Sequence, residues 1–212
     1  MPAAGAKAAK NPYSVHPGIE MMVKWVAELK QKTGRSLEEW LALIKKEGPA
    51  TEAERRDWLK KKHGLGTNSA WWLAQRASGK TGEEDTPEGY LKAAVKYVDE
   101  MLAGGKSGLR PIYDALLKLG LGIGPDAKAC PCKTIAPLYR NHVFAQIKPT
   151  TRTRIDFGLC FKDYKGKLPK RLIPTGGAEK GDRITHRIEI TKLDDIDGEV
   201  KRWLKAAYDL DK

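Results

Sequence analysis

The chain has 212 residues, with 39 Lys and Arg against 27 Asp and Glu, and so carries a formal net charge of +12. Its apolar fraction of 41% is enough for a packed core, and no run approaches the ~20 apolar residues of a membrane span. The start lacks the apolar stretch of a secretory signal, and three cysteines are too few for a disulfide-stapled domain. We therefore expect a soluble, cytoplasmic protein with no membrane partner.

The N-terminal part of the chain shows helical periodicity. Residues 1–16, rich in Ala, Lys and Gly, predict a flexible tail. Apolar residues then recur every three or four positions in four runs separated by Gly or Pro, which predicts a four-helix module over residues 17–77. Two of these runs begin with capping boxes, in which a hydroxyl and a carboxylate satisfy free backbone amides. The pairs are Ser36 with Glu39 and Thr51 with Glu54.

A change in composition separates this module from the rest. Residues 78–89 contain no large apolar side chain, and we expect them to form a linker. Helical spacing resumes near residue 90, and after the glycines that follow residue 119 the apolar period changes to two, which is typical of strands. A final amphipathic run predicts a terminal helix. Residues 90–212 thus predict a two-layer α/β module with a mainly antiparallel sheet and a C-terminal helix, and the whole chain belongs to the α+β class.

Two stretches of sequence resemble known families. The string GRSLEEWLALIKKEGPATEAERRDWLKKKHGLG resembles the helical domain of unknown function DUF4287. The strings CPCKTIAPLYRNHVFAQIKPTTRTRIDFGLCFK, DRITHRIEI and EVKRWLKAAYD resemble the domain of unknown function DUF5655. The resemblance implies two modules in this order. It supplies no catalytic residue and no activity.

The surplus positive charge lies mainly in one segment. Residues 128–192 contain 15 basic and 5 acidic residues, a surplus of +10. A localised positive field concentrates polyanions, so we expect this surface to bind DNA or RNA through backbone contacts, without catalysis. An acidic protein partner could use the same surface. The alternative interpretation is that these lysines only keep the protein soluble, without binding a partner, and this alternative stays open.

Five basic residues in this segment are candidates for phosphate contacts. They lie at the turn of a predicted hairpin and on a strand that could be its neighbour, and Arg suits bidentate contact with phosphate. The candidates are Lys148, Arg152, Arg154, Arg183 and Arg187. Asp156 and Glu189 share the polar faces of the same strands. A lattice of cross-strand ion pairs is therefore the alternative interpretation.

A second candidate is the string Gly64-Leu65-Gly66, which precedes a predicted helix. It fits the turn of helix-hairpin-helix modules, where two glycines let backbone amides approach a phosphate at a helix N-terminus. Lys60, Lys61 and Lys62 come directly before it. A tight helix-ending turn explains the same glycines, and both interpretations remain open.

A different class of function would use a pocket in the second module. His186 falls on an apolar strand face, where Tyr139 and Asp182 could join it to hold a small molecule or a metal. A core histidine bonded to the backbone is the alternative.

No other pattern indicates a cofactor or a reaction. Cys130, Cys132 and His142 fall short of the four ligands that structural zinc takes. The glycine-rich, metalloprotease and nucleophile-elbow motifs are missing from the sequence. We expect no metal and no cofactor, and the sequence favours a binding protein over an enzyme without settling the question.

Overall fold

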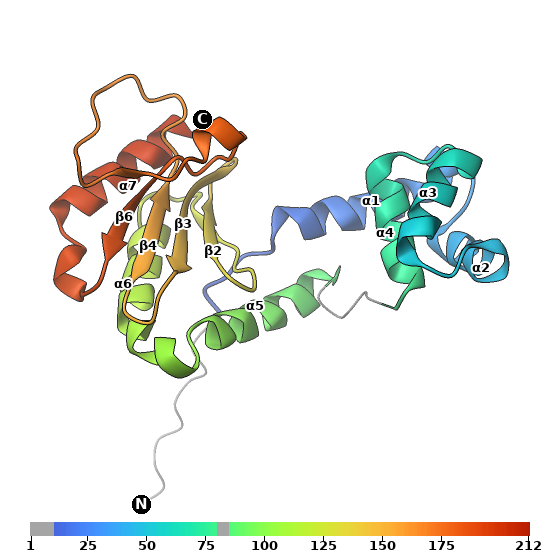
Figure 1. Cartoon of the computed structure of the whole chain (residues 1–212), viewed down its shortest axis with the longest axis horizontal. Coiled ribbons are helices and arrows are strands. Elements are labelled where there is room, and N and C mark those ends of the chain that lie inside the picture. The colour runs from blue at the N-terminus through green and yellow to red at the C-terminus, as the bar shows by residue number, and fades with distance from the viewer. Residues whose placement is uncertain (1–10, 80–84) are drawn as a thin grey trace, which may run out of the picture. The chain divides into compact units, whose positions relative to one another are not determined.

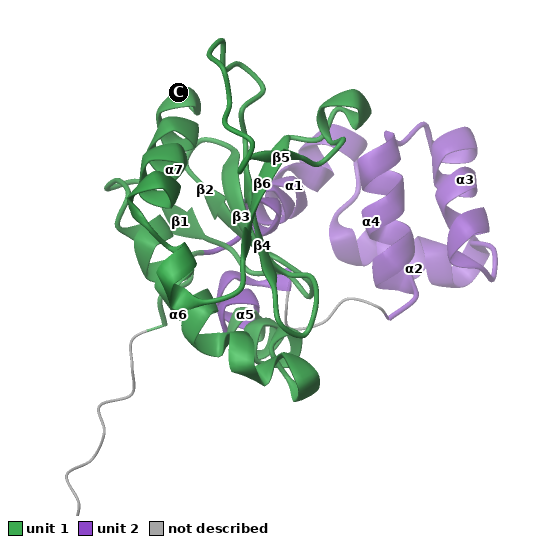
Figure 2. Ribbon diagram, turned by 60° about the vertical axis from the view of Figure 1, so that its left-hand side comes forward, with its two compact units in different colours: residues 1–14, 93–212 green, residues 15–92 purple. Residues whose placement is uncertain are grey.

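The computed structural model describes residues 11–79 and 85–212, and two compact units make up the chain. Figure 2 shows them in different colours: a helical unit, Val15–Lys92, and a sheet unit formed by Met1–Ser14 and Ala93–Lys212. The order of helices and strands confirms the predicted α+β class (Figure 1). The predicted boundaries of tail, modules and linker remain a prediction. Of the tail, residues 1–10 lie outside the described part, as do residues 80–84 of the linker.

The described part of the helical unit contains four complete helices, which end at glycines or at Ser78. They are α1 (Pro17–Thr33), α2 (Leu37–Glu47), α3 (Glu52–His63) and α4 (Thr67–Ala77). Both predicted capping boxes are present, so the starts of α2 and α3 are fixed by local chemistry. The apolar faces of the four helices meet in one core. Its largest buried members are Leu29, Trp40, Ile44, Leu59 and Leu73.

Helix α5 (Pro87–Met101) begins in the helical unit and ends in the sheet unit. The sheet unit continues with the 3₁₀ helix η2 (Gly104–Leu109) and the helix α6 (Arg110–Leu121). Its six strands are β1 (Lys128–Ala129), β2 (Ala136–Tyr139), β3 (Val143–Pro149), β4 (Ile155–Leu159), β5 (Ile173–Pro174) and β6 (His186–Ile190). The short η3 (Ala178–Lys180) and η4 (Leu193–Asp195) flank β6, and α7 (Gly198–Leu210) follows.

The strands form one antiparallel sheet in the order β1-β2-β3-β4-β6-β5. Helices α6 and α7 cover the same face of it (Figures 1 and 2). The strand residues that alternate toward these helices are apolar and buried, as the period of two predicts; Phe157, for example, lies between Ile147 and Ile188. The opposite phase of β3, β4 and β6 carries Lys148, Asp156 and Arg187 and forms a polar face.

Successive turns between the strands lie at alternate ends of the sheet. Because β1 to β4 run in sequence as antiparallel neighbours, the β1–β2 and β3–β4 turns share one end. The 160–172 loop after β4 and the β2–β3 turn share the opposite end. Segment 11–14 also belongs to this unit, since Ser14 donates its amide hydrogen to Ala129 O at 2.9 Å.

The hydrophobic lengths of the helices bear on membrane association. Over residues 11–79 and 85–212, no helix combines the length and apolar character that a bilayer span requires.

We predict that Gly124→Ala destabilises the sheet unit by about 1–3 kcal/mol, a typical cost of overpacking. An added Cβ would overlap the ring and hydroxyl of Tyr208, whose hydroxyl donates to Asp126. Amide hydrogen exchange of β2 and β3 measures the change. Gly108→Ala is the control, because a Cβ there meets no atom within 4 Å. Equal exchange rates in the two variants would contradict the packing explanation.

Candidate nucleic-acid interface

The polar face of the sheet holds an ion-pair lattice around one buried carboxylate. Asp156 is only 7% exposed, and it accepts from Thr150 Oγ1 at 2.8 Å and lies 2.9 Å from Arg154 Nε. Glu189 lies 3.0 Å from both Arg154 Nη1 and Arg187 Nη2. The cross-strand ion pairs that the sequence offered as an alternative are therefore present. They engage two of the five candidate cations, Arg154 and Arg187.

Arg183 is occupied at the opposite end of the sheet. It lies 2.9 Å from Asp211, a carboxylate only 4% exposed, and also donates to Val143 O at 3.2 Å. The same carboxylate accepts the backbone amide of His142 at 2.7 Å and lies 3.0 Å from its Nδ1. These contacts fasten the end of α7 to the β2–β3 turn, so Arg183 does not join the cations of the β3–β4 hairpin.

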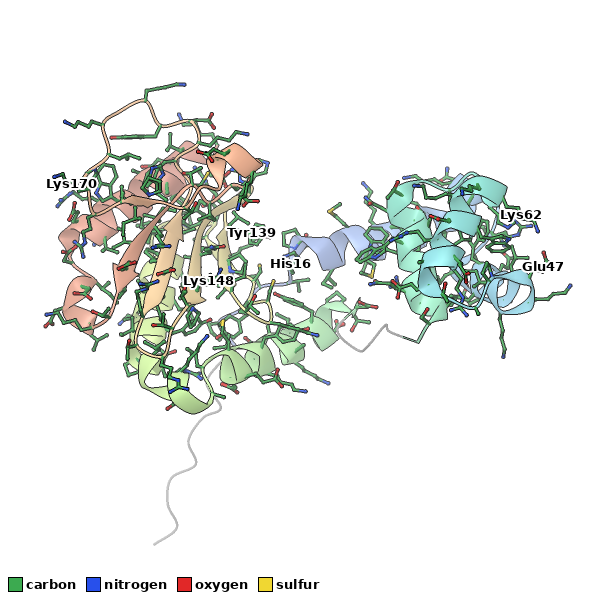
Figure 3. All side chains as sticks on the ribbon, viewed as in Figure 1. His16, Glu47, Lys62, Tyr139, Lys148 and Lys170 are labelled. Atoms are coloured by element: carbon green, nitrogen blue, oxygen red, sulfur yellow. The ribbon has the colours of Figure 1, made fainter. Side chains whose placement is uncertain are left out.

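The two remaining candidates, Lys148 and Arg152, lie together on the wall of a cleft. Neither side chain has a hydrogen bond or ion pair with any residue the structure describes. Lys148 lies opposite Asp156 in the strand register, but Thr150 and Arg154 already occupy the oxygens of that carboxylate. The lattice thus leaves the Lys148 ammonium, labelled in Figure 3, exposed to solvent.

The cleft has a volume of about 540 Å³ and lies at the end of the sheet that carries the β1–β2 and β3–β4 turns. It is lined by four cationic side chains, one carboxylate and two threonines. They are Lys106, Lys133, Lys148, Arg152, Glu100, Thr134 and Thr150. No carboxylate in the described chain pairs with any of the four cations. Lys106 Nζ donates only to Pro149 O at 2.6 Å, and Lys133 Nζ lies 6.0 Å from the Tyr97 ring centre.

Gly105 lines this cleft, and Gly104 precedes it. Gly104 adopts a left-handed conformation with φ of 59°, which turns the chain from α5 into η2. An added Cβ at Gly105 would lie 3.1 Å from Arg152 Cδ, so the Arg152 side chain packs directly on the glycine. The lack of a side chain at Gly105 therefore allows Arg152 to lie at the edge of the cleft.

Sequence reasoning missed Lys106 and Lys133 as members of this site. Lys106 lies outside the segment of surplus charge, in a connection between two helices, and Lys133 lies in a strand turn. Only the strand order brings η2, the β1–β2 turn and the β3–β4 turn to one place. The periodicity of the sequence carries no signal for this juxtaposition.

The glycine hairpin of the helical unit has a different set of cationic neighbours from the predicted one. Gly64 ends α3 in a left-handed conformation with φ of 66°, so the turn interpretation describes it. Gly66 begins α4 without a side-chain cap. The hairpin lines a hollow of about 420 Å³ that Lys32 and Arg35 also line.

The three lysines before the hairpin do not line this hollow. Lys60 and Lys61 are exposed, and Lys62 lies 3.8 Å from Glu47 (labelled in Figure 3).

His63 lines the same hollow, and its ring packs edge-on against Trp40 and Trp58 with centroid distances of 5.3 and 4.4 Å. Burial, together with the charges of Lys62 and Arg35, lowers the pKa of His63 below its ordinary value of 6.5. The folded helical unit therefore binds fewer protons than the unfolded chain near and below that pH.

We predict that the helical unit loses stability as the pH falls from 7.5 to 5.5, because the unfolded chain gains the His63 proton first. Guanidinium titration followed by tryptophan fluorescence measures the midpoint at each pH. His63→Phe removes the titrating group and should reduce the pH dependence. An unchanged pH dependence in His63→Phe would assign the effect to other groups.

The structure places two predicted members of the alternative pocket, Tyr139 and His186, on strands that are not neighbours. Tyr139 on β2 and His186 on β6 are three strands apart, about 14 Å at normal strand spacing. His186 Nδ1 lies 2.9 Å from Thr185 Oγ1, and burial lowers the pKa of its imidazole. Burial also raises the pKa of Tyr139 to about 12. Asp182 donates its amide hydrogen to Gly177 O in the η3 turn.

The candidate metal ligands are also apart. Cys130 and Cys132 lie in the β1–β2 turn, whereas His142 lies with Asp211 at the other end of the sheet. Within residues 11–79 and 85–212, no three side chains of His, Cys, Asp and Glu gather as a metal site would require.

Fold and site together define a two-layer α+β domain with a basic cleft at one end of its antiparallel sheet, preceded by a helical domain. The chain belongs to the family of the domain of unknown function DUF5655, whose model matches residues 98–211, more than half of the chain. The domain of unknown function DUF4287 matches residues 23–78. Both predicted resemblances are confirmed. Neither the curated proteins nor the solved structures give a match to this chain.

We predict that Arg154→Gln lowers the free energy of unfolding by about 1–3 kcal/mol, because it removes the positive charge closest to the buried carboxylate of Asp156. Lys148→Gln, on the same hairpin and without a partner in the described chain, should stay within about 0.5 kcal/mol of the parent. Urea unfolding of both variants provides the comparison. Equal stability of the two would show that the lattice contributes nothing.

Proposed function

We propose that the sheet unit binds nucleic acid through the phosphate backbone, and that Lys106, Lys133, Lys148 and Arg152 make the contact. The observation that supports this proposal is the concentration of four cations without a carboxylate partner in one cleft. Most Arg residues of the sheet unit have acidic neighbours. These four have no acidic partner in the described part of the chain, so their charge remains available to a ligand.

The composition of the cleft favours backbone contact. Four positive charges face the single carboxylate of Glu100, which lies 3.7 Å from Lys96. No aromatic side chain is among the lining residues, so the cleft offers no platform for base stacking. Ammonium and guanidinium groups that bind phosphate act independently of base sequence. We therefore infer binding with little sequence preference and without catalysis.

The hairpin of the helical unit is a second candidate for contact of the same kind. Its α4 amides lack a side-chain cap, and Arg35 lies on the wall of the same hollow. Lys60 and Lys61 are exposed and precede Gly64 by one helical turn. We include them as further contacts to a nucleic acid bound at this hairpin. An acidic protein is the alternative partner for the cleft.

The test is the affinity of Lys148→Gln/Arg152→Gln for a fluorescein-labelled DNA duplex, measured by anisotropy at several salt concentrations. Losing two phosphate contacts should lower affinity about tenfold or more near 0.1 M salt, and should reduce the slope of log K against log[salt] by about 2. Both residues lack partners in the described chain, so the fold should be unaffected.

Lys118→Gln/Lys201→Gln is the matched control. It removes the same charge from exposed positions on α6 and α7. A smaller loss in the control supports a localised site. Equal losses in the two double variants, or no binding by the parent at 50 mM salt, would contradict the proposal.

A further inference from the structure

A second group of unpaired cations lies on the loop after β4. Residues 160–172 contain no helix or strand and connect β4 to β5. Four lysines of this loop are exposed and make no hydrogen bond or ion pair with any described residue. They are Lys162, Lys165, Lys167 and Lys170. Asp163 is the one acidic residue among them, which leaves a surplus of +3 over residues 162–170. We call residues 162–170 the lysine loop.

Packing at the base of the lysine loop gives it a defined shape. The Tyr164 ring lies edge-on against Phe161 and Trp203, with ring centroids 5.6 and 5.9 Å apart. A Cβ added at Gly166 would come within 2.6 Å of the Tyr164 hydroxyl, so the backbone closes over this ring. The base of the loop is therefore packed against the sheet unit, and the loop projects beyond the end of β4 (Figure 1).

Arg171 fastens the C-terminal end of the loop. Its guanidinium donates to Asp197 at 2.6 Å, to Glu199 at 2.9 Å and to Asp195 O at 2.6 Å. Arg171 is thus paired with carboxylates, and the same contacts anchor the end of the 160–172 loop. The lysines have no partner among the residues that the structure describes, and their charge is available to a ligand.

The lysine loop and the cleft lie at opposite ends of the sheet. The five residues of β4 separate them, about 17 Å at normal strand rise. Figure 1 shows the loop beyond the upper end of β4, away from the β3–β4 turn, and Figure 3 shows Lys170 well apart from Lys148. A mononucleotide or a free phosphate cannot reach from one group to the other.

We propose that the lysine loop is a second phosphate contact for the same ligand, and that this ligand is duplex nucleic acid lying along the sheet unit. The inference rests on the proposed function of the cleft. A gap of about 17 Å corresponds to about five base-pair steps of 3.4 Å. Between the two ends, the ion pairs of Arg154 and Arg187 neutralise Asp156 and Glu189, so the polar face does not repel phosphates.

In the described part of the sheet unit, the lack of an exposed Trp, Tyr or Phe favours a duplex over a single strand. In the described part of the sheet unit, the exposed large hydrophobic residues are Val95 and Leu193, and neither is aromatic. Proteins that bind single strands commonly stack bases on aromatic side chains. A surface with a surplus of cations suits the regular backbone of a duplex.

The experiment compares DNA hairpins with stems of 4 and 16 base pairs, about 14 and 54 Å long. The variant Lys165→Gln/Lys167→Gln/Lys170→Gln should bind the long stem about tenfold more weakly and lower its salt slope by about 3. Its affinity for the short stem should equal that of the parent. The control Lys118→Gln/Lys128→Gln/Lys201→Gln removes the same charge from exposed positions elsewhere on the sheet unit.

The outcomes separate this inference from the proposal for the cleft. Equal affinity of the loop variant and the control for the long stem would overturn the role of the lysine loop, even if the cleft variant still loses binding. Equal affinity of the parent for a 16-nucleotide single strand and for the long stem would overturn the assignment of a duplex. Failure of the parent to bind either stem would instead refute the cleft itself.

Discussion

The carboxylate of Asp156 lies on the polar face of the sheet, buried to 7% exposure, and a charge in that position must be compensated. Its partners come from the same hairpin and from β6: Thr150, Arg154 and, at 3.7 Å, Arg187. This requirement determines which basic residues can meet a ligand. The arginines closest to the buried carboxylate are held by it, while Lys148, its direct neighbour in the register, is left to solvent.

The same separation of structural from available cations recurs elsewhere in the sheet unit. Arg183 serves Asp211, and Arg171 serves Asp197 and Glu199, so that each holds a helix or loop in place. Each of these arginines is paired at 3 Å or less. Within residues 11–79 and 85–212, the cations that line the cleft or lie on the lysine loop have no such carboxylate. A count of charges along the sequence cannot make this distinction, because it treats every basic residue alike.

Much of the architecture was predictable from the sequence, because it follows from local rules. The capping boxes at Ser36 and Thr51 fix two helix starts, and the period of two in 155–161 marks a strand that covers a core. The candidate site was predictable only in part. Lys148 and Arg152 fall at a hairpin turn that the sequence shows, but Lys106 joins them through strand order and the path of η2, which are tertiary features.

The central claim is that unpaired cations grouped in the cleft, rather than the net charge of the chain, form the surface for nucleic acid. Lysine footprinting by acetylation and mass spectrometry, with and without a 16-base-pair duplex, tests it most directly on the intact chain. The account predicts that Lys106, Lys133 and Lys148 lose reactivity when the duplex binds, while Lys118 and Lys128 react as before. Uniform protection of all five lysines, or protection of Lys118 and Lys128 alone, would contradict it.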